Sequence, residues 1–437
     1  MTQPRTLKLP ITNVYALGDY TVRLHLGSEQ SPVNLLLDTG SSPLVVKHGT
    51  YVPKNDKQLK ATAIAQEVTY GIGGWNGPMV NTLISIGDKD PITLESSHIA
   101  LVSGTEQAKT FGNADGMLGL AYHHLNKGFN LAGYFQQKNV SPALTYPWPF
   151  NPSSQAQSID PEVDSTDLKG FKSFLWRYPE HDITPYFTEL EQHKLTANKF
   201  AFYSKRSSIH IADNGNSDTE QLLQDPLNQG FLILGGGEEH IELYQGEFSS
   251  IRVENDVYYN VVLTSVQVGD KKPIIALPLA EKDKSAYFTN AIIDTGAGGI
   301  VLTADIYQQM VTDLIAINPG FEALITPFQD INAQQTGIDA SLLNLEQWPE
   351  IKFNFVKSCK TGDDGTVIKT TTQLVCQPDT YWQINAPKQG KACFKILSQL
   401  PQWPNQSIIG LPLINNYHVV FDRLEHKTCA IKFARPK

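Results

Sequence analysis

The chain has 437 residues, of which 41% are hydrophobic, and it contains 32 glycines and 26 prolines. This length allows two hydrophobic cores, and the composition is that of a folded, turn-rich protein rather than a fibrous or disordered one. The formal net charge is -9, from 44 acidic and 35 basic residues, and no long basic run occurs. We therefore expect neither nucleic-acid binding nor electrostatic attachment to a membrane.

The N-terminal segment, residues 1–10, lacks the apolar stretch of a secretory signal. No later segment approaches the roughly 18 apolar residues of a membrane-spanning helix. These features predict a soluble, cytoplasmic protein, although a chain whose signal had been removed would look the same.

Strand-like patterns dominate the first part of the chain. Residues 21–26 alternate apolar and polar side chains, as a half-buried strand does. A second apolar run, at residues 35–37, leads into the sequence Asp-Thr-Gly-Ser at 38–41. Clusters of Gly, Pro, Asn and Asp interrupt such runs at short intervals, which is typical of β-sandwiches and β-barrels.

The middle of the chain has a different texture. Residues 139–180 carry many Pro, Ser and aromatic residues, and we interpret them as part of an insertion around 125–182. We expect this insertion to be a surface excursion packed by its own aromatic side chains, with a role facing the substrate as the alternative. A helical pattern follows at 183–194, and the polar residues 207–224 are a candidate linker.

The last part of the chain is again rich in strand patterns. Residues 261–268 roughly alternate, and residues 304–316 form a helical pattern for which Thr303 is a plausible N-cap. The apolar residues 291–293 lead into Asp-Thr-Gly-Ala at 294–297, which repeats the earlier Asp-Thr-Gly.

The two Asp-Thr-Gly sequences belong to a weak internal repeat. Each is followed further along by two apolar residues and a glycine, at 117–119 and at 408–410. Such a repeat of strand-rich halves indicates a duplicated β domain. We predict an N-terminal lobe of residues 1–206, a linker of residues 207–224 and a C-terminal lobe of residues 225–437.

Paired carboxylates explain why the Asp-Thr-Gly sequence occurs twice. One copy alone is most simply a turn, but an apolar run that ends in Asp delivers a carboxylate from a buried strand to its exposed end. Two carboxylates that lie close together cannot both ionise easily. One carboxylate then accepts a proton from water while the other donates a proton to the substrate carbonyl. The pairing of Asp38 with Asp294 therefore predicts hydrolysis of an amide without a covalent intermediate.

With these paired sequences, the chain resembles the pepsin family of aspartic proteases over nearly its whole length. Further segments resemble family motifs in the right order, at residues 68–74, 115–120, 183–187, 232–236, 407–410 and 420–423. The resemblance implies an all-β, bilobal fold: two related β-barrel-like lobes with an active-site cleft between them and a few short helices. It also implies an endopeptidase that acts at acidic pH on peptides or unfolded proteins, preferring bulky apolar residues around the cut. The absence of a signal and of a basic prosegment resembles the bacterial, shewasin-like members.

The resemblance assigns a role to individual residues. Asp38 and Asp294 are the catalytic pair. The residues that would support their loops are Thr39, Gly40, Ser41, Thr295, Gly296 and Ala297. The residues of the flap that would cover a bound peptide are Tyr70, Gly71, Ile72 and Gly73. The resemblance implies a monomer that needs no cofactor and no metal.

Three positions depart from the family pattern. Val45 stands where relatives carry a Trp that hydrogen-bonds the flap tyrosine, so we expect Tyr70 to be held differently or to be more mobile. Ile72 stands where relatives often carry Thr or Ser. Ala297 stands where pepsin has a hydroxyl residue, whereas Ser41 fills the equivalent place in the first loop. Because a hydroxyl that donates to a carboxylate lowers its pKa, we expect Asp38 to have the lower pKa and activity to lie in milder acid than for pepsin.

Four cysteines lie in the last fifth of the chain, at positions 359, 376, 393 and 429. The chain has neither a Cys-x-x-Cys pair nor a His-Glu-x-x-His motif, so a metal site is not expected. Cys359, Cys376 and Cys393 are close enough in sequence for one disulfide of open connectivity, whereas a reducing cytosol favours four thiols.

Two other functions compete with that of a protease. A catalytically silent member of the family could act as a binding or inhibitor protein, but such members typically lose a catalytic Asp or the flap. A glycosidase also uses a pair of carboxylates, but the duplicated β architecture speaks against it.

Overall fold

The structure is a computed structural model. It describes residues 4–70, 73–105, 110–150, 159–160, 162–212, 218–361, 367–424 and 429–437, without the side chains of 104–105, 359–361 and 367–368. Contacts divide the chain into two compact units, one of Thr21–Leu195 and one that combines Pro4–Tyr20 with Thr196–Lys437.

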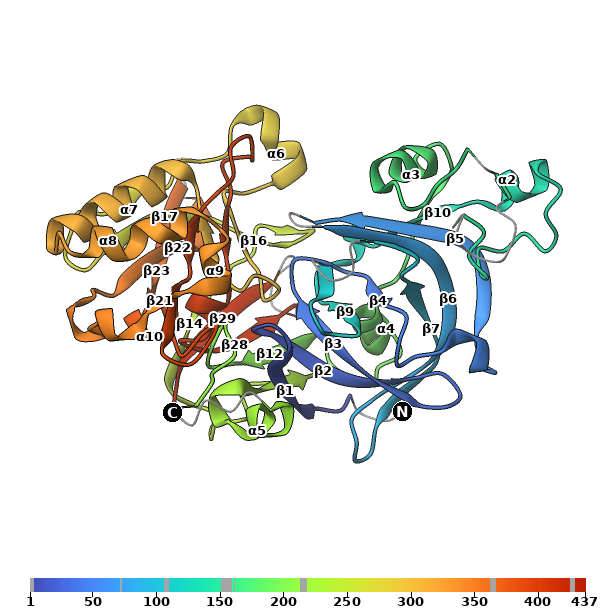
Figure 1. The fold of residues 1–437 in the computed structure, drawn as a ribbon, viewed down its shortest axis with the longest axis horizontal. Coiled ribbons are helices and arrows are strands. Elements are labelled where there is room, and N and C mark those ends of the chain that lie inside the picture. The colour runs from blue at the N-terminus through green and yellow to red at the C-terminus, as the bar shows by residue number, and fades with distance from the viewer. Residues whose placement is uncertain are drawn as a thin grey trace. The chain divides into compact units, whose positions relative to one another are not determined.

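A closed β-barrel forms the centre of the first unit. Among its described residues, six strands follow the order β2-β3-β9-β4-β7-β6, and β6 pairs again with β2 (Figure 1). Their bounds are β2 (Asp19–Leu26), β3 (Ser31–Asp38), β4 (Leu44–Val46), β6 (Gly74–Ile86), β7 (Ile92–Leu101) and β9 (Gly116–Gly119). The alternation at 21–26 explains β2, because Val22, Leu24 and Leu26 are buried while Arg23 is exposed. The predicted strand is therefore confirmed.

A β-hairpin extends from this barrel. Strand β5 (Lys60–Thr69) pairs with β6 in a register that places Val68 opposite Trp75 and Thr69 opposite Gly74. The Tyr70 N–H donates to the Gly73 carbonyl at 3.1 Å, which closes the turn. The sequence expected to form a flap is thus a hairpin, although two of its predicted residues, Gly71 and Ile72, lie outside the described residues.

The insertion has a small hydrophobic core of its own. It contains β10 (Lys127–Asn130), α2 (Ala132–Gln137), α3 (Leu168–Leu175) and β11 (Glu180–Asp182). The buried side chains of this core are Ala65, Phe129, Leu131, Tyr134, Phe135, Trp148, Phe150, Phe171, Phe174 and Leu175. Several of the rings meet edge to face, for example Trp148 and Phe150 with centroids 5.1 Å apart. The expectation that the insertion is packed by its own aromatic residues is confirmed.

The second unit contains a larger set of sheets in its described part. The first sheet follows β1-β13-β12-β28-β29-β14; its strands are β1 (Leu7–Ala16), β13 (Gln229–Leu234), β12 (Lys199–Tyr203), β28 (His418–Asp422), β29 (Ala430–Pro436) and β14 (Tyr244–Arg252). The second follows β15-β16-β19-β27-β20-β26; its strands are β15 (Asn255–Asp256), β16 (Tyr259–Val261), β19 (Ala291–Ile293), β27 (Ser407–Ile409), β20 (Ile300–Leu302) and β26 (Ile396–Ser398).

Two smaller sheets complete this unit in the part that the structure describes. One follows β18-β17-β22-β23; its strands are β18 (Ile274–Ile275), β17 (Leu263–Val268), β22 (Ile351–Thr361) and β23 (Val367–Cys376). The other follows β21-β25-β24; its strands are β21 (Ile338–Asp339), β25 (Lys391–Phe394) and β24 (Trp382–Ile384). Strands therefore dominate the described residues, and the predicted all-β class is confirmed.

The contacts group the chain differently from the lobe limits expected from the sequence. Strands β1 and β12 both pair with β13, and β12 also pairs with β28, so all of them lie in the second unit. Helix α5 (Thr219–Gln224) forms within the segment expected to be a linker, and its Leu222 is buried. The predicted limits of 1–206 and 225–437 stay a prediction.

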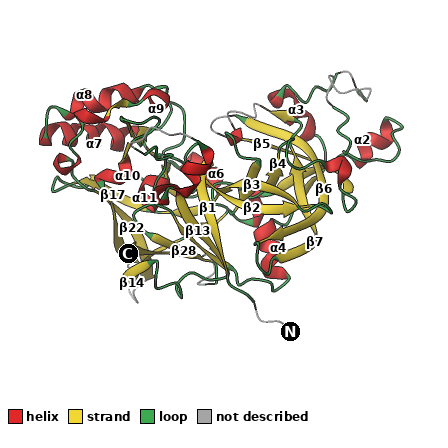
Figure 2. Ribbon diagram, turned by 60° about the horizontal axis from the view of Figure 1, so that its bottom comes forward, coloured by secondary structure: helices red, strands yellow, loops and turns green. Residues whose placement is uncertain are grey.

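Helices are mostly short and lie beside the sheets (Figure 2). The first unit has α4 (Tyr186–Gln192) within the predicted helix at 183–194. The helices of the second unit that remain are α6 (Glu281–Tyr287), α7 (Ala304–Ile317), α8 (Phe321–Ile325), α9 (Ala333–Thr336), α10 (Pro378–Tyr381) and α11 (Leu411–Ile414). Helix α7 confirms the helix predicted at 304–316, and its buried Ile306, Met310 and Leu314 follow a spacing of four. Thr303 occupies the N-cap position, but its side chain makes no capping hydrogen bond.

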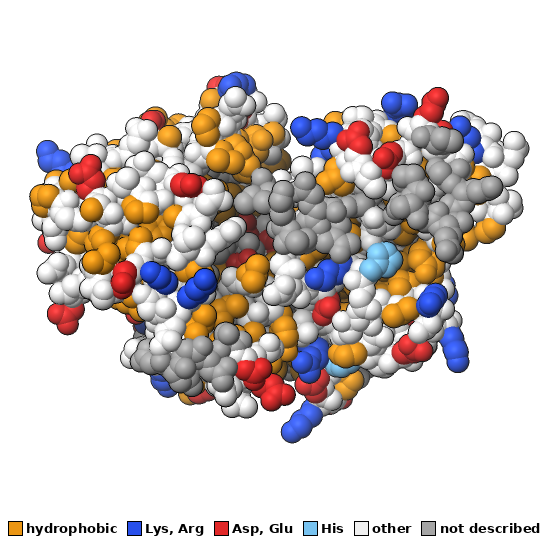
Figure 3. Space-filling view, in the orientation of Figure 1, with side chains coloured by type: hydrophobic (Ala, Val, Ile, Leu, Met, Phe, Trp, Pro, Cys, Tyr) orange, Lys and Arg blue, Asp and Glu red, His pale blue; other side chains and the backbone are white. Residues whose placement is uncertain are grey.

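The surface carries mixed charge. On the face drawn in Figure 3, basic and acidic side chains of the described residues lie interspersed rather than gathered by sign. Among the helices of the described residues, none is long and apolar enough to cross a membrane.

Candidate active site

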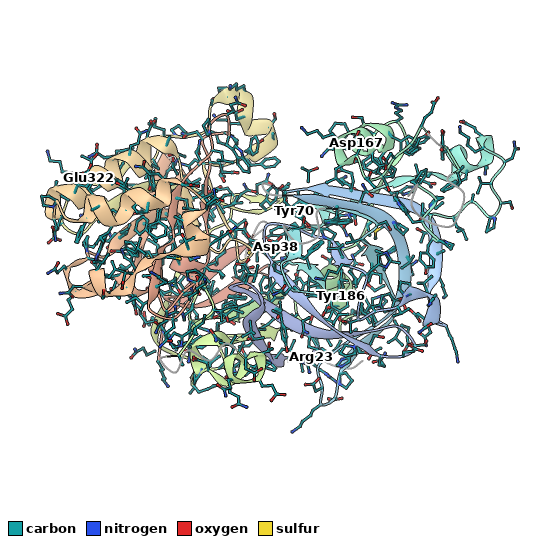
Figure 4. All side chains as sticks on the ribbon, viewed as in Figure 1. Arg23, Asp38, Tyr70, Asp167, Tyr186 and Glu322 are labelled. Carbon is teal, nitrogen blue, oxygen red and sulfur yellow. The ribbon has the colours of Figure 1, made fainter. Side chains whose placement is uncertain are left out.

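The first Asp-Thr-Gly loop begins where β3 ends. Asp38 is the last residue of this strand and is only 6% exposed, while Tyr70 lies nearby in the same unit (Figure 4). The Gly40 N–H donates to Asp38 Oδ1 at 2.7 Å, and Ser41 Oγ donates to Asp38 Oδ2 at 2.6 Å. Both oxygens of the carboxylate therefore accept a hydrogen bond from the loop, and such bonds favour its charged form. The hydroxyl contact expected for Ser41 is present.

Strand β9 supports this loop from beneath. It runs parallel to β3 and places Gly119 opposite Asp38. The Gly119 N–H donates to the Pro43 carbonyl at 3.0 Å, and the Leu120 N–H donates to the Asp38 carbonyl at 2.7 Å. A Cβ atom at Gly119 would collide with the backbone of Ser42 and would lie 2.6 Å from the carbonyl oxygen of Ser41. The Gly that ends the repeated pattern is therefore required by close backbone contact.

The second Asp-Thr-Gly loop is built in the same way inside the second unit. Strand β19 ends one residue before Asp294 and runs parallel to β27. The Asp294 N–H donates to the Ile409 carbonyl at 3.0 Å, and the Gly296 N–H donates to Asp294 Oδ1 at 2.9 Å. A Cβ atom at Gly410 would collide with the carbonyl oxygens of Ala297 and Gly299.

The two loops differ at one position. Ala297 has no hydroxyl with which to repeat the bond that Ser41 makes to Asp38. Its carbonyl accepts the Leu411 N–H at 2.9 Å, so the backbone of the loop is held although the side-chain bond is missing. Thr39 and Thr295 follow the two aspartates, and both are fully buried in their own units.

Trp75 supports the flap tyrosine, a contact that was not predicted from the sequence. Trp75 is fully buried on β6, and its Nε1–H donates to the Tyr70 hydroxyl at 3.0 Å. The Tyr70 hydroxyl in turn donates to Met117 Sδ at 3.3 Å. The described contacts of the Tyr70 hydroxyl thus include a tryptophan donor, and this donor is Trp75 on β6.

Met117 connects the flap tyrosine to the first aspartate loop. Its sulfur lies 3.0 Å from Ser41 Oγ, whose single proton is committed to the shorter bond with Asp38. A continuous row of contacts therefore runs from Trp75 through Tyr70, Met117 and Ser41 to Asp38, entirely within the first unit. The sequence offered a signal for Trp75, because this tryptophan directly follows the flap sequence at 68–74. No pattern in the sequence around Met117 pointed to its contacts.

We expect Trp75→Phe to raise KM for a peptide substrate by about five-fold to ten-fold, because Tyr70 loses a hydrogen bond worth about 1 kcal/mol. Tyr70→Phe removes the other partner of the same bond. If the bond carries the effect, the double variant costs no more than the larger single change. Steady-state kinetics on all three variants measure this, and strictly additive costs would contradict the assigned role.

The described residues offer little to a metal ion. Among them, no group of three or more His, Cys, Asp or Glu side chains could hold one. Cys376 and Cys393 are buried thiols, and burial raises the pKa of Cys376 to about 12 and that of Cys393 above its usual value. Cys429 is buried as well, while the side chain of Cys359 lies outside the described residues.

The geometry of the two loops agrees with comparisons to known proteins. The family model described as "Eukaryotic aspartyl protease" matches residues 19–141 and 220–435, which include both loops and the flap hairpin. The chain belongs to this family.

Curated relatives of the aspartyl protease family are distant from this chain. A vacuolar aspartic protease of Candida albicans is 22% identical over 311 residues, which cover 68% of this chain and 54% of that protein. A beta-secretase of Strongylocentrotus purpuratus is 20% identical over 434 residues, which cover 95% of this chain and 66% of that protein. The chain thus spans between about half and two thirds of the length of these relatives.

Proposed function

We propose that the chain is an aspartic endopeptidase that cleaves internal peptide bonds at acidic pH, with Asp38 and Asp294 as its catalytic pair. The observation that carries the proposal is that both aspartates sit in loops of one design. Asp38 is the last residue of β3 and Asp294 directly follows β19, and each Oδ1 accepts the N–H of the glycine two residues further along. Membership of the aspartyl protease family supports the same pairing.

The proposed chemistry needs two carboxylates and one proton between them. The ionised carboxylate accepts a proton from a water molecule, which attacks the peptide carbonyl while the protonated carboxyl donates to the carbonyl oxygen. Asp38 accepts hydrogen bonds on both oxygens and is suited to the ionised role. Asp294 lacks the bond that Ser41 supplies and is suited to hold the proton. The resemblance to pepsin further suggests bulky apolar residues on either side of the cut.

The difference between the loops predicts a change in pH dependence. In Ala297→Thr, a hydroxyl that donates to Asp294 favours the ionised carboxylate, so the proton is lost at lower pH. We expect the alkaline limb of the profile of kcat/KM to move to lower pH by about half a unit to one unit. Ala297→Val is the matched control, because it adds the same bulk without the hydroxyl. An equal movement in both variants would show that the hydroxyl is not the cause.

Cleavage of a denatured protein near pH 4, with and without pepstatin, tests the proposed activity. New peptide ends detected by mass spectrometry, and their loss with pepstatin, are the expected result. Absence of cleavage between pH 3 and pH 6 would reject the protease and favour a catalytically silent binding or inhibitor protein.

We further propose a reducing compartment such as the cytoplasm, and a protease that acts as a monomer. The buried thiols Cys376 and Cys393 support the first part, because oxidising compartments favour disulfides. Sedimentation of the purified protein checks the second part, and a stable dimer at micromolar concentration would overturn it.

A further inference from the structure

Most of the insertion lies outside the residues that the family model matches. The family model leaves residues 142–219 unmatched. Nevertheless, the described part of the insertion is well packed, because Trp148, Phe150, Phe171 and Phe174 are at least nine-tenths buried in its own core. A segment that has a hydrophobic core of its own can hold in place the strands against which it packs.

The insertion is first attached along the outer edge of the flap hairpin. Strand β10 pairs with β5, with Phe129 opposite Ala65, and Ala65 belongs to the core of the insertion. The Leu131 N–H donates to the Ala63 carbonyl at 2.9 Å, and Thr145 Oγ1 donates to the Thr62 carbonyl at 2.9 Å. The edge of β5 is thereby covered by the insertion.

A second set of contacts lies close to the flap turn. Lys172 on α3 pairs with Glu67 of β5 at 3.1 Å and donates to Thr69 Oγ1 at 3.4 Å. The Glu67 side chain is only 9% exposed while that of Lys172 is 32% exposed, so this ion pair is partly shielded from water. Glu67 and Thr69 lie on β5, three residues and one residue before Tyr70. Figure 1 draws α3 in green beside this end of β5.

The opposite strand of the hairpin is held as well. Asn76 of β6 is buried, and its Nδ2 donates to the Ser165 carbonyl of the insertion at 2.8 Å. Ser165 is itself fixed, because its Oγ accepts the Nε1–H of Trp148 at 3.0 Å. Asn76 directly follows Trp75, the donor to the Tyr70 hydroxyl. Both strands of the flap are thus tied to the insertion within three residues of this hydrogen bond.

We propose that the insertion is a brace that fixes the flap hairpin for substrate binding, and that Lys172 is a positioning residue within it. The role of the flap rests on the proposed protease function, whereas the bracing itself does not. A flap that is already in place lets a peptide bind without the cost of ordering the hairpin. If the competent position of the flap is only partly populated, the apparent affinity falls by that fraction.

The sharpest test compares Lys172→Met with Lys138→Met in the full chain. Lys138 is a matched control, because it pairs with Asp160 at 2.7 Å inside the insertion and, like Lys172, lies over an aromatic ring. We expect amide hydrogen exchange in β5 and in the first half of β6 to be about five-fold faster in Lys172→Met. The same amides exchange at the wild-type rate in Lys138→Met. The charge swap Glu67→Lys with Lys172→Glu restores slow exchange.

Equal acceleration in both lysine variants, or none in either, would overturn the brace. In peptide cleavage, we expect Lys172→Met to raise KM about three-fold with kcat retained, and Lys138→Met to change neither. Faster exchange with an unchanged KM would reject the role in substrate binding. If the wild-type chain cleaves no peptide, the proposed function fails, while the exchange measurements still decide whether the insertion holds the hairpin.

Discussion

We expect Asp38→Asn to lower kcat/KM for a peptide substrate by about 10⁴-fold, and Asp294→Asn to do the same. The size of the loss follows from the role of a positioned general acid or base, which contributes up to about 10⁴-fold. Asn retains the size of Asp and an oxygen that can accept the N–H of Gly40 or Gly296, so the loops keep their shape. The substitution removes the negative charge of the carboxylate and its ability to exchange a proton. Cleavage of a fluorogenic peptide near pH 4 measures the effect.

The two aspartates should behave as one unit. If they share a proton, Asp38→Asn with Asp294→Asn costs no more than either change alone. Asp339→Asn is a suitable control, because Asp339 caps a short helix through the Ser341 N–H and Asn caps equally well. Either single catalytic variant that retains a tenth of wild-type activity would contradict the pairing.

The sequence predicted the features of the site that depend on neighbours along the chain. An apolar run ending in Asp is sufficient to place a carboxylate at the end of a strand, and both Asp38 and Asp294 lie there. The helix at 304–316 was equally visible, because its buried residues repeat with the period of a helix. The many aromatic residues of the insertion predicted its separate core, because apolar side chains gathered in one segment are buried away from water.

Contacts between distant segments were not visible in the sequence. The sequence shows that Val45 replaces the tryptophan of relatives, but the donor to Tyr70, Trp75, depends on how β5 and β6 pair. Met117 is one apolar residue among many until β9 brings its sulfur to Ser41 and Tyr70. Strand β1 joins the second unit because it pairs with β13, more than 200 residues away. The local periodicity of the sequence predicts that a strand forms, but it does not identify the strand with which it pairs.

Gly119 and Gly410 pack closely against the backbone of the two aspartate loops. We expect Gly410→Ala to lower the free energy of unfolding by about 3 kcal/mol and to lower kcat/KM by about 100-fold. A Cβ atom at this position meets two carbonyl oxygens, those of Ala297 and Gly299, and backbone cannot move aside as a flexible side chain can. The backbone at Gly410 is extended, with φ -93°, so the cost comes from collision alone and not from a strained conformation.

The same argument applies to Gly119 in the first unit, and it can be separated from a general effect of adding a methyl group. Gly119→Ala places its Cβ against the backbone of Ser41 and Ser42, so it should match Gly410→Ala in both stability and activity. Gly133→Ala is the control, because no atom lies within 4 Å of the Cβ it would add, and in helix α2 alanine is the better helix former. Thermal unfolding and peptide cleavage of the three variants decide the matter. If Gly119→Ala and Gly410→Ala remained as stable and active as Gly133→Ala, the close backbone contact could not be what positions the aspartates.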